Sequence, residues 1–423
     1  MTPAQIADVA LFASTQRYGD LTIHAVLDVR RRFARSDLER AVQAVTQAFP
    51  VLGSRYAPGF WRDRWLPVDA PIADSVHVVD EPADLETETA AWVRRPLALT
   101  RDRPLRLVSL ARGERSTLLL SVSHLAVDGA GMAAVGHVLA AHLYGAAPSA
   151  PVDARRTLAS SLEGLRWYHV AVLARDVLAS LLVPLRISFA AARERHFTAG
   201  ATAEPSWRHV TIGAVDLERL KARGRPVGAT VNDALIAALA RISVGRTRRG
   251  PLAVIYTMDL RRYAGSPRLT AANTSSILSV VVPRAAVADP AATLAVVARL
   301  TARQRRSLVG PAFFVMPSAF GLVTPHAWVR LVTPWIHPLL IEPSLRRGLV
   351  FTNVGRLDEG LSAFGADLER VRIIGPNIAG VNAPVVVAFG LRGELHLQLF
   401  AAPGLAVAAL DELETELRAG LAE

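Results

Sequence analysis

The sequence predicts an α+β fold, within the broad α/β class, in which mixed sheets are covered by helices and the chain forms two lobes. The chain has 423 residues, of which 51% are hydrophobic. That is enough for two cores, because a single core rarely grows beyond about 250 to 300 residues. Strand-like runs also occur in adjacent pairs between helices, instead of alternating one strand with one helix as in a parallel sheet.

The N-terminal lobe is predicted over residues 1–150, and its first clear element is a helix from Ser36 to Phe49. Apolar residues recur there at helical spacing. Ser36 is placed to cap the first turn and Pro50 to end the helix. A short helix is expected around residues 86–95.

A hairpin and a second helix should follow. Leu105–Leu110 and Thr117–Ser123 are strand-like runs joined by a turn that contains glycine, which predicts an antiparallel pair. His124 would then lie just past the end of a strand. Gly129 and Gly131 are expected to form a turn, and Met132 to Tyr144 reads as a helix with an apolar face.

The second half of the chain is predicted to form a linker and a C-terminal lobe. Residues 151–205, which begin in a stretch rich in Ala, Pro and Ser, are expected to be a helical linker. Residues 206–423 should form the C-terminal lobe. Its predicted helices span residues 230–244, 290–306 and 406–421, and its predicted strands span residues 252–258, 277–283, 349–353, 385–389 and 394–400.

Composition excludes several classes of protein. The net charge is +11, but nearly all positive residues are scattered arginines and no nucleic-acid-binding motif accompanies them, so no nucleic acid is expected as partner. An anionic small molecule or an acidic carrier protein suits this charge better.

The chain has no cysteine, which excludes disulfides, thiolate zinc sites and cysteine nucleophiles. Residues 1–15 do not resemble a secretion signal, so a cytoplasmic location is expected.

Three stretches without formal charge raise the question of membrane contact. They are Gly129–Val152, Ser307–Val329 and Ile373–Leu391, and glycine and proline interrupt each of them, so no transmembrane segment is predicted. Two interpretations remain: buried core with loops, or a surface that contacts lipid as a peripheral membrane protein would. In the second stretch the side chains of Phe313, Phe314, Met316 and Phe320 are candidates to line a lipophilic channel, or to pack in the core.

The residues with the clearest chemical meaning are His124, Asp128 and Gly129, in the order His, three residues, Asp, Gly. The histidine ends a strand that leaves an apolar core, where its ring can face a cavity. With an ordinary pKa of about 6.5, a histidine can take a proton from an alcohol or amine that attacks a carbonyl. General base is therefore the predicted role of His124.

Ser121 to Tyr144 resembles the HxxxDG segment of the superfamily that includes chloramphenicol acetyltransferase, peptide-synthetase condensation domains and bacterial wax ester/diacylglycerol acyltransferases. Further stretches are similar in matching order along nearly the whole chain. They are Phe33 to Tyr56, Thr230 to Ala234, Met258 to Arg261, Asn273 to Ser276, and Phe351 to Gly355 with Asn353.

The resemblance implies two chloramphenicol acetyltransferase-like lobes with a tunnel between them and His124 at its centre. It also implies that Asp128 has a structural role and pairs with an arginine, for which Arg261 is the candidate. Ser123 stands where condensation domains and wax ester enzymes have a first histidine. The second histidine is the base in those proteins, so the chemistry is retained, and branches with a single histidine fit equally well.

Asn273, Ser275 and Ser276 have two interpretations. Their side chains could donate hydrogen bonds to the oxyanion that forms when the carbonyl is attacked, a contribution of about 2.7 to 4 kcal/mol in enzymes that use such donors. They could equally be residues that satisfy the backbone at the start of a strand.

Together these features predict an acyltransferase of lipid or natural-product biosynthesis. It would move an acyl group directly from acyl-CoA or a phosphopantetheine-linked acyl carrier protein to a hydroxyl or amine of a small, lipophilic acceptor. The acyl donor is a co-substrate, and neither a permanently bound cofactor nor a metal is expected. The alternative is a non-catalytic, condensation-domain-like protein that binds a carrier-linked or lipophilic ligand.

Overall fold

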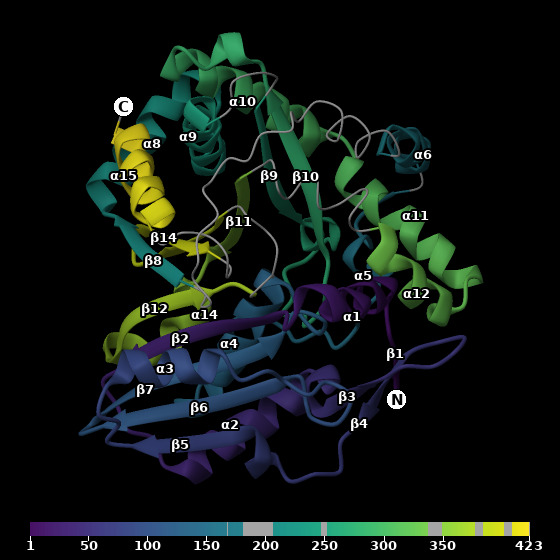
Figure 1. Cartoon of the computed structure of the whole chain (residues 1–423), viewed down its shortest axis with the longest axis vertical. Coiled ribbons are helices and arrows are strands. Elements are labelled where there is room, and N and C mark those ends of the chain that lie inside the picture. The colour runs from purple at the N-terminus through teal and green to yellow at the C-terminus, as the bar shows by residue number, and fades with distance from the viewer. Residues whose placement is uncertain are drawn as a thin grey trace.

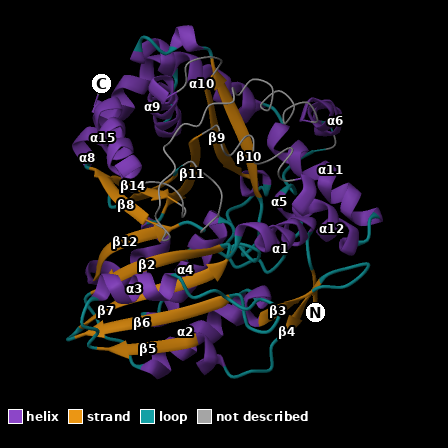
Figure 2. Cartoon of the chain, viewed as in Figure 1, coloured by secondary structure: helices purple, strands orange, loops and turns teal. Residues whose placement is uncertain are grey.

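The computed structural model describes residues 1–166, 168–180, 206–246, 252–336, 349–376, 384–401 and 408–422. Within these ranges the protein is a mixed α/β structure with three sheets. Figures 1 and 2 show two larger sheets, one below the other, with helices on their outer faces. The predicted α+β architecture with two lobes is confirmed.

The five-stranded sheet forms the lower part of the molecule in Figure 1. Its middle strands form the predicted hairpin, with Gly113 in the turn at a φ of 57°. All neighbouring strands are antiparallel except β5 and β6. The order is β12 (Leu368–Ile374), β2 (Thr22–Val29), β7 (Arg115–Ser123), β6 (Leu105–Arg112) and β5 (Val76–Asp80).

This sheet is not built from the first 150 residues alone, because β12 comes from late in the chain. Its residues pair with β2 along nearly their whole length. One core of buried apolar side chains joins the sheet to α2 (Arg35–Ala48) and α4 (Gly129–Leu143). Helix α3 (Leu85–Val93), which corresponds to the short helix expected near residues 86–95, contributes Trp92 to a smaller core on the same sheet.

Two predicted helix starts need correction. Helix α2 begins at Arg35 after Ala34, which offers no capping side chain, so Ser36 lies inside the first turn and does not cap it. Helix α4 begins at Gly129 and not at Met132, because the Asp128 side chain accepts a hydrogen bond from the backbone N–H of Gly131. The cap allows the helix to start in the glycine-rich stretch.

The six-stranded sheet lies above the first one in Figure 1. The predicted strands and helices of this half are confirmed with small changes in length, and α10 has the predicted bounds. Strand β8 and helix α8 were not predicted. The strand order is β10 (Ser275–Val282), β9 (Leu252–Asp259), β11 (Leu349–Arg356), β13 (Val385–Leu391), β14 (Glu394–Ala401) and β8 (Ser206–Ile212). The helices of this half are α8 (Ala214–Gly224), α9 (Val231–Arg246), α10 (Pro290–Arg306) and α15 (Ala408–Ala422), whereas the short helix α14 (Asp358–Leu361) packs against α4 in the core of the five-stranded sheet.

A third group of elements lies at the right of Figure 1. The predicted linker contains α5 (Leu158–Ser161) and α6 (His169–Ser180), and its residues 181–205 lie outside the described residues. The remaining members are a small sheet of β1 (Thr2–Pro3), β4 (Arg64–Pro67) and β3 (Ser54–Ala57), and the helices α1 (Ile6–Tyr18), α11 (Val309–Val323) and α12 (His326–Ile336).

In the part of the chain that the structure describes, no single helix combines the length and the apolar character needed to cross a bilayer. Two bent pairs of helices reach that length and composition only when their halves are taken together. They are Ala214–Val227 with Val231–Val244, and Pro290–Arg306 with Val309–Val323.

Candidate active site

His124 follows the last residue of β7, at the end of the five-stranded sheet. Its backbone N–H donates to the carbonyl of Leu21 at 2.8 Å, and the N–H of Ser123 donates to Pro104 at 2.9 Å. The Ser123 hydroxyl accepts a hydrogen bond from the N–H of Leu125 at 3.2 Å, which turns the chain away from the strand. Ser123 is 1% exposed, whereas His124 is only partly buried.

The Asn273 side chain orients the His124 ring. Its amide nitrogen donates to two backbone carbonyls, of His124 at 2.5 Å and of Leu125 at 3.0 Å. Its oxygen therefore faces the ring and lies 3.1 Å from Nδ1. An amide oxygen can only accept, so Nδ1 carries the proton and Nε2 keeps a lone pair. No described residue forms a hydrogen bond with Nε2, so the ring presents a basic nitrogen.

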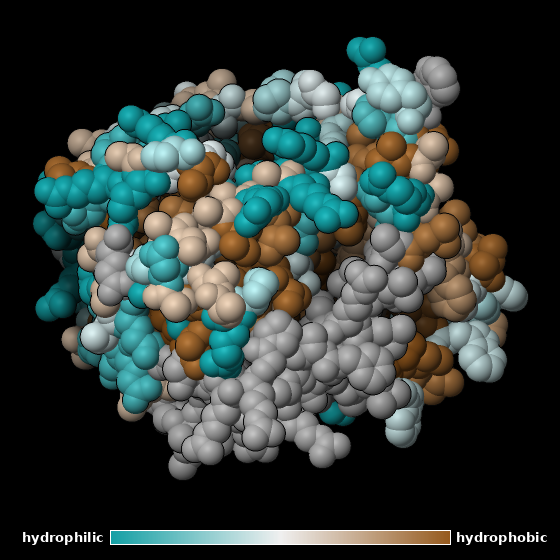
Figure 3. All heavy atoms as spheres, turned by 90° about the horizontal axis from the view of Figure 1, so that it is seen from above, coloured by the Kyte–Doolittle hydropathy of each residue, from teal (hydrophilic) through white to brown (hydrophobic). Residues whose placement is uncertain are grey.

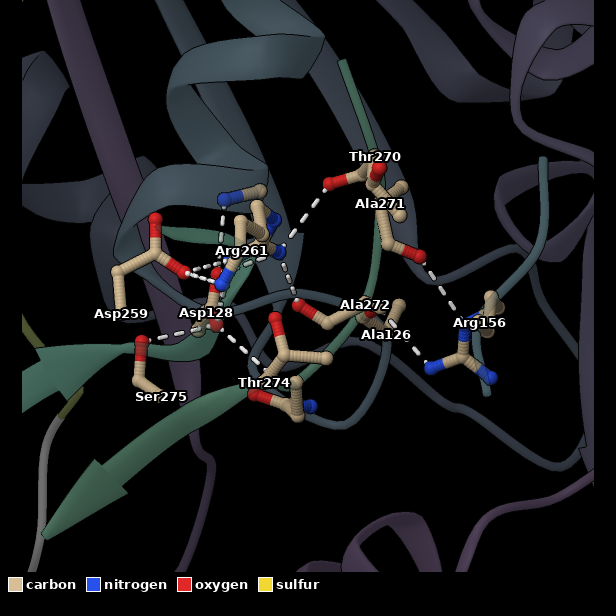
Figure 4. Close-up of polar contacts among 12 residues, drawn as sticks. Ala126, Asp128, Arg156, Asp259, Arg261, Thr270, Ala271, Ala272, Thr274 and Ser275 are labelled. Atoms are coloured by element: carbon tan, nitrogen blue, oxygen red, sulfur yellow. Dashed lines mark hydrogen bonds and ion pairs between the residues drawn. The ribbon is translucent and has the colours of Figure 1, made fainter. Parts of the chain in front are cut away.

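Asp128 is fully engaged in holding the turn between β7 and α4 (Figure 4). One oxygen accepts from the N–H of Gly131 at 2.8 Å and from Arg261 at 3.0 Å. The other accepts from Arg261 at 3.0 Å, the N–H of Thr274 at 2.9 Å and the Ser275 hydroxyl at 2.9 Å. The predicted ion pair between Asp128 and Arg261 is confirmed, and it is bidentate.

Arg261 lies in the short turn Leu260–Tyr263 that follows β9. Besides Asp128, it donates to Asp259 at 3.0 Å and to the carbonyls of Thr270 at 3.2 Å and Ala272 at 2.9 Å. Burial alone would raise the pKa of Asp128, but the Arg261 charge and the hydrogen bonds to the carboxylate lower it below its ordinary value. Asp128 therefore stays ionised, and its hydrogen bonds join the turn after β7 to Arg261, Thr274 and Ser275.

A second arginine, Arg156, holds the same turn and was not predicted. It donates to the carbonyls of Ala126 at 3.1 Å and Leu125 at 3.3 Å, and to Ala271 at 3.0 Å. Its guanidinium also pairs with Asp8 at 2.8 and 3.1 Å. The two side chains are 3% and 0% exposed. No local pattern indicates this pair, because its members are 148 residues apart.

The two arginines hold one segment of chain between them. Figure 4 shows Arg261 and Arg156 on either side of residues 270–272. Arg261 binds the carbonyls of Thr270 and Ala272, and Arg156 binds that of Ala271. Asn273 comes next in the chain, so these contacts fix the residue that orients the His124 ring.

The structure assigns structural contacts to two of the three residues considered as oxyanion donors, Asn273 and Ser275. The Ser275 hydroxyl donates to Asp128, and the Asn273 amide hydrogens are already used by two carbonyls. Ser276 is 0% exposed and faces the opposite side of β10 from Ser275, since side chains alternate along a strand. Its hydroxyl has no hydrogen-bond partner among the described residues. For Asn273 and Ser275 the geometry therefore favours the structural interpretation over that of oxyanion donors.

The remaining predicted residues lie where the second lobe meets the start of α4. The Asn353 amide donates to Asn232 at 2.5 Å, and its oxygen accepts from the N–H of Gly355 at 2.7 Å. These contacts join β11 to α9 and do not include His124. A side chain on Gly129 would meet Val354 at 3.3 Å, so glycine allows β11 to approach the helix. The predicted tunnel stays a prediction.

Sequence reasoning also missed a buried histidine beside the site. His24 on β2 faces Ser121 on β7, with 2.9 Å between Nδ1 and the hydroxyl. Burial, helped by the positive charge of Arg106, lowers the pKa of His24 to about 3. His24 is therefore neutral at neutral pH. Nothing in its sequence context distinguishes it from a histidine at a surface.

Comparison with known proteins gives the fold. No protein-family model and no curated protein sequence matches the chain. Among solved structures, the first condensation domain of the CDA synthetase is 18% identical, with 99% of this chain and 95% of that chain covered and a TM-score of 0.68. The trichothecene 15-O-acetyltransferase from Fusarium sporotrichioides is 11% identical, with coverages of 100% and 95% and a TM-score of 0.69.

A third similar structure is the starter condensation domain of rhizomide synthetase, in complex with C8-CoA and Leu-SNAC. It is 14% identical, with 99% of this chain and 93% of that chain covered and a TM-score of 0.67. At such identities the similarity shows the fold. The chain has the two-lobed fold of these condensation domains and of this acetyltransferase, as its sequence predicted.

Proposed function

We propose that this protein is an acyltransferase that moves an acyl group from a thioester to a hydroxyl or amine, with Nε2 of His124 as general base. The observation that carries the proposal is the contact between Asn273 and Nδ1, which leaves the lone pair on Nε2. A lone pair on a partly buried imidazole, at a turn fixed by two arginines, is what a general base requires.

The reaction follows from this arrangement. Nε2 takes the proton of the acceptor while the acceptor oxygen or nitrogen attacks the thioester carbonyl. The tetrahedral intermediate collapses, the carbon–sulfur bond breaks, and the imidazolium returns the proton to the departing sulfur. The products are the ester or amide and a free thiol, and His124 ends in its starting state.

Transfer is direct in this proposal. A covalent acyl-enzyme would need a nucleophile activated by the base. The nearest hydroxyls in the chain are engaged elsewhere, since Ser123 accepts from Leu125 and Ser121 contacts His24. Mass spectrometry of the protein incubated with donor alone should show the unmodified mass. A stable acyl adduct would contradict direct transfer.

The proposed donor is acyl-CoA or a phosphopantetheine-linked acyl chain on a carrier protein. Support comes from the rhizomide starter domain, whose structure holds two thioester-type ligands, C8-CoA and Leu-SNAC. The other two similar structures are a condensation domain of the CDA synthetase and a trichothecene 15-O-acetyltransferase. A small-molecule acceptor of natural-product or lipid biosynthesis is therefore proposed, with a carrier protein as a candidate partner and no permanently bound cofactor.

The test is release of free thiol from acetyl-, octanoyl- and palmitoyl-CoA in the presence of mixed alcohols and amines. Removing a general base costs about 10²- to 10⁴-fold in rate, so His124→Ala should lose that much turnover. His142→Ala is the matched control, because His142 is exposed on α4. Turnover that survives in His124→Ala would overturn the proposal. A wild-type protein that binds the donors without turnover would favour a non-catalytic ligand-binding protein.

A further inference from the structure

Helix α12 exposes its apolar side to solvent. Trp328, Leu331, Val332, Trp335 and Ile336 follow the spacing of a single helical face. They are 55%, 61%, 41%, 74% and 39% exposed. A helix on the surface of a globular protein normally buries this face.

The opposite side of α12 is polar and faces the protein. The ring of His326 accepts a hydrogen bond from the N–H of Asp63 at 2.9 Å. The Arg330 guanidinium forms an ion pair with the Asp63 side chain, which is 0% exposed, and donates to the carbonyl of Gly59 at 3.0 Å. Turning the helix over would leave the carboxylate of Asp63 buried without this partner, which is costly. The outward orientation of the apolar face is therefore built into the packing.

The loop before β4 and the end of α11 extend this surface. The N–H groups of His326 and Ala327 donate to the carbonyls of Trp61 at 3.1 Å and Phe60 at 3.0 Å. The side chains of Phe60 and Trp61 are 61% and 62% exposed. At the end of α11, Leu322 and Val323 are 74% and 77% exposed. We call these four residues and the exposed face of α12 the α12 patch.

Figure 3 shows apolar side chains along the right side of the molecule, the side on which α11 and α12 lie in Figure 1. Exposed apolar surfaces of this extent mark sites of protein or membrane contact. The charges around the α12 patch indicate which of the two, a protein or a membrane, it contacts.

The α12 patch carries positive charge and no exposed acid in its helices. Residues 307–336 contain one charged residue, Arg330, and its partner Asp63 is buried. At the rim, Arg62 donates to the carbonyls of Trp61 at 2.9 Å, Thr324 at 3.0 Å and Leu322. These acceptors are neutral, so the positive charge of Arg62 is not cancelled by them. Tryptophan side chains prefer the membrane interface, and arginine there attracts anionic headgroups.

We propose that the α12 patch is a docking surface for a lipid bilayer with anionic headgroups. Helix α12 has eleven residues, fewer than the roughly 20 that a spanning helix needs. It would lie in the plane of the interface, with its tryptophans at the boundary between headgroups and acyl chains and Arg62 at the headgroups. The proposal goes beyond acyl transfer and does not depend on it.

Vesicle flotation tests the proposal, with phosphatidylcholine vesicles that contain or lack phosphatidylglycerol. The wild type should float with the anionic vesicles. Leu331→Asp/Trp335→Asp should bind at least about tenfold more weakly, because both side chains would leave the apolar interface. Val215→Asp is the matched control, since Val215 is 67% exposed on α8, away from the patch. Arg62→Gln should lower the preference for anionic vesicles about fivefold.

Two further measurements decide whether a lipid bilayer or a second copy of the chain covers the α12 patch. Brominated lipids should quench wild-type tryptophan fluorescence, and Trp328→Phe/Trp335→Phe should reduce that quenching. Absence of wild-type flotation, or equal binding by the double-aspartate variant, would overturn the proposal. So would a lipid-free dimer, seen by analytical ultracentrifugation, that the same variant converts to monomer, because a second copy would then cover the α12 patch.

Discussion

Asp128→Asn is the substitution that most directly examines how the His124 turn is held. The two side chains have the same shape, but the amide is neutral and replaces one acceptor oxygen with a donor. The carboxylate accepts five hydrogen bonds, two of them from Arg261. Because Arg261 contacts both oxygens, the amide nitrogen of Asn would face one of its N–H groups in either orientation; with the oxygen toward Gly131, the nitrogen would also face the donors of Thr274 and Ser275.

The expected loss of stability can be worked from these contacts. Breaking one side of a buried ion pair costs about 3 to 5 kcal/mol. Arg261 keeps Asp259 and two carbonyls as partners, so the lower end, about 3 kcal/mol, is expected for Asp128→Asn. Unfolding entropy is about 2.1 cal/mol/K per residue. For a 423-residue chain that unfolds as one unit, the melting temperature should fall by about 3 to 4 °C.

The effect should also depend on pH, because the pKa of Asp128 is lowered in the folded state. A lowered carboxyl pKa stabilises the folded protein above the unfolded-state pKa, which is about 3.9. The contribution is lost as the pH falls through the folded-state pKa. The stability difference between wild type and Asp128→Asn should therefore be constant near neutral pH and shrink in acid below about pH 4.

Thermal and urea unfolding of both proteins at neutral and acid pH measure these quantities. Asp216→Asn is the control, because Asp216 and its partner Arg219 are 65% and 74% exposed and such pairs contribute little. Equal melting temperatures for wild type and Asp128→Asn at neutral pH would refute the reasoning. So would a stability difference that stays the same in acid.

Three other substitutions examine the surroundings of the site. Asn273→Asp would place an anionic oxygen beside Nδ1 of His124 and stabilise the imidazolium, so the acid limb of the pH–rate profile should move to higher pH; an unmoved limb would contradict the Asn273 contact. Arg156→Met leaves the Asp8 carboxylate buried without its partner and should cost about 3 to 5 kcal/mol in urea unfolding. A wild-type unfolding curve for that variant would show that the pair does not hold the turn. His24 has a pKa of about 3 in the folded protein and about 6.5 when unfolded, so between these values wild-type stability should fall by about 1.4 kcal/mol per pH unit as the pH drops. His24→Gln should remove the contribution of His24 to this pH dependence of stability. An equally steep pH dependence in the variant would contradict the low pKa of His24.

Local spacing predicted the elements that carry their own signals. The helix Pro290–Arg306 was predicted with its observed bounds, and in the structure the Asp289 side chain caps its first turn. The hairpin was predicted because two apolar runs flank a glycine turn. In contrast, β12 pairs with β2 across more than 300 residues of chain. Such pairing depends on how the whole chain folds, which a local pattern does not contain.

The candidate site likewise contains residues that the sequence identifies and residues that only the folded structure identifies. The order of His124, Asp128 and Gly129 is visible in the sequence, and the resemblance to known acyltransferases supplied Arg261 as partner of Asp128. Asn273 was noticed, but whether its amide faces the ring or a substrate depends on the two carbonyls beside it. Arg156 was missed, because only the folded chain brings it to the turn.

Helix α12 shows a different limit of sequence reasoning. The uncharged stretch that includes the start of α12 was compatible with a core or with a lipid-contacting surface. Periodicity identifies an apolar face but not what that face meets. The buried partner Asp63, which lies 267 residues before Arg330, decides that the polar side turns inward.

The tautomer of His124 is the measurement that tests the central claim most directly. Nitrogen-15 NMR of histidine-labelled protein distinguishes a protonated ring nitrogen from one with a lone pair, and the His124→Ala spectrum assigns the signals. With Asn273 on Nδ1, the neutral ring should carry its proton on Nδ1 and show a lone pair on Nε2. A proton on Nε2 of the neutral ring would contradict the assignment of His124 as a general base presented by Asn273.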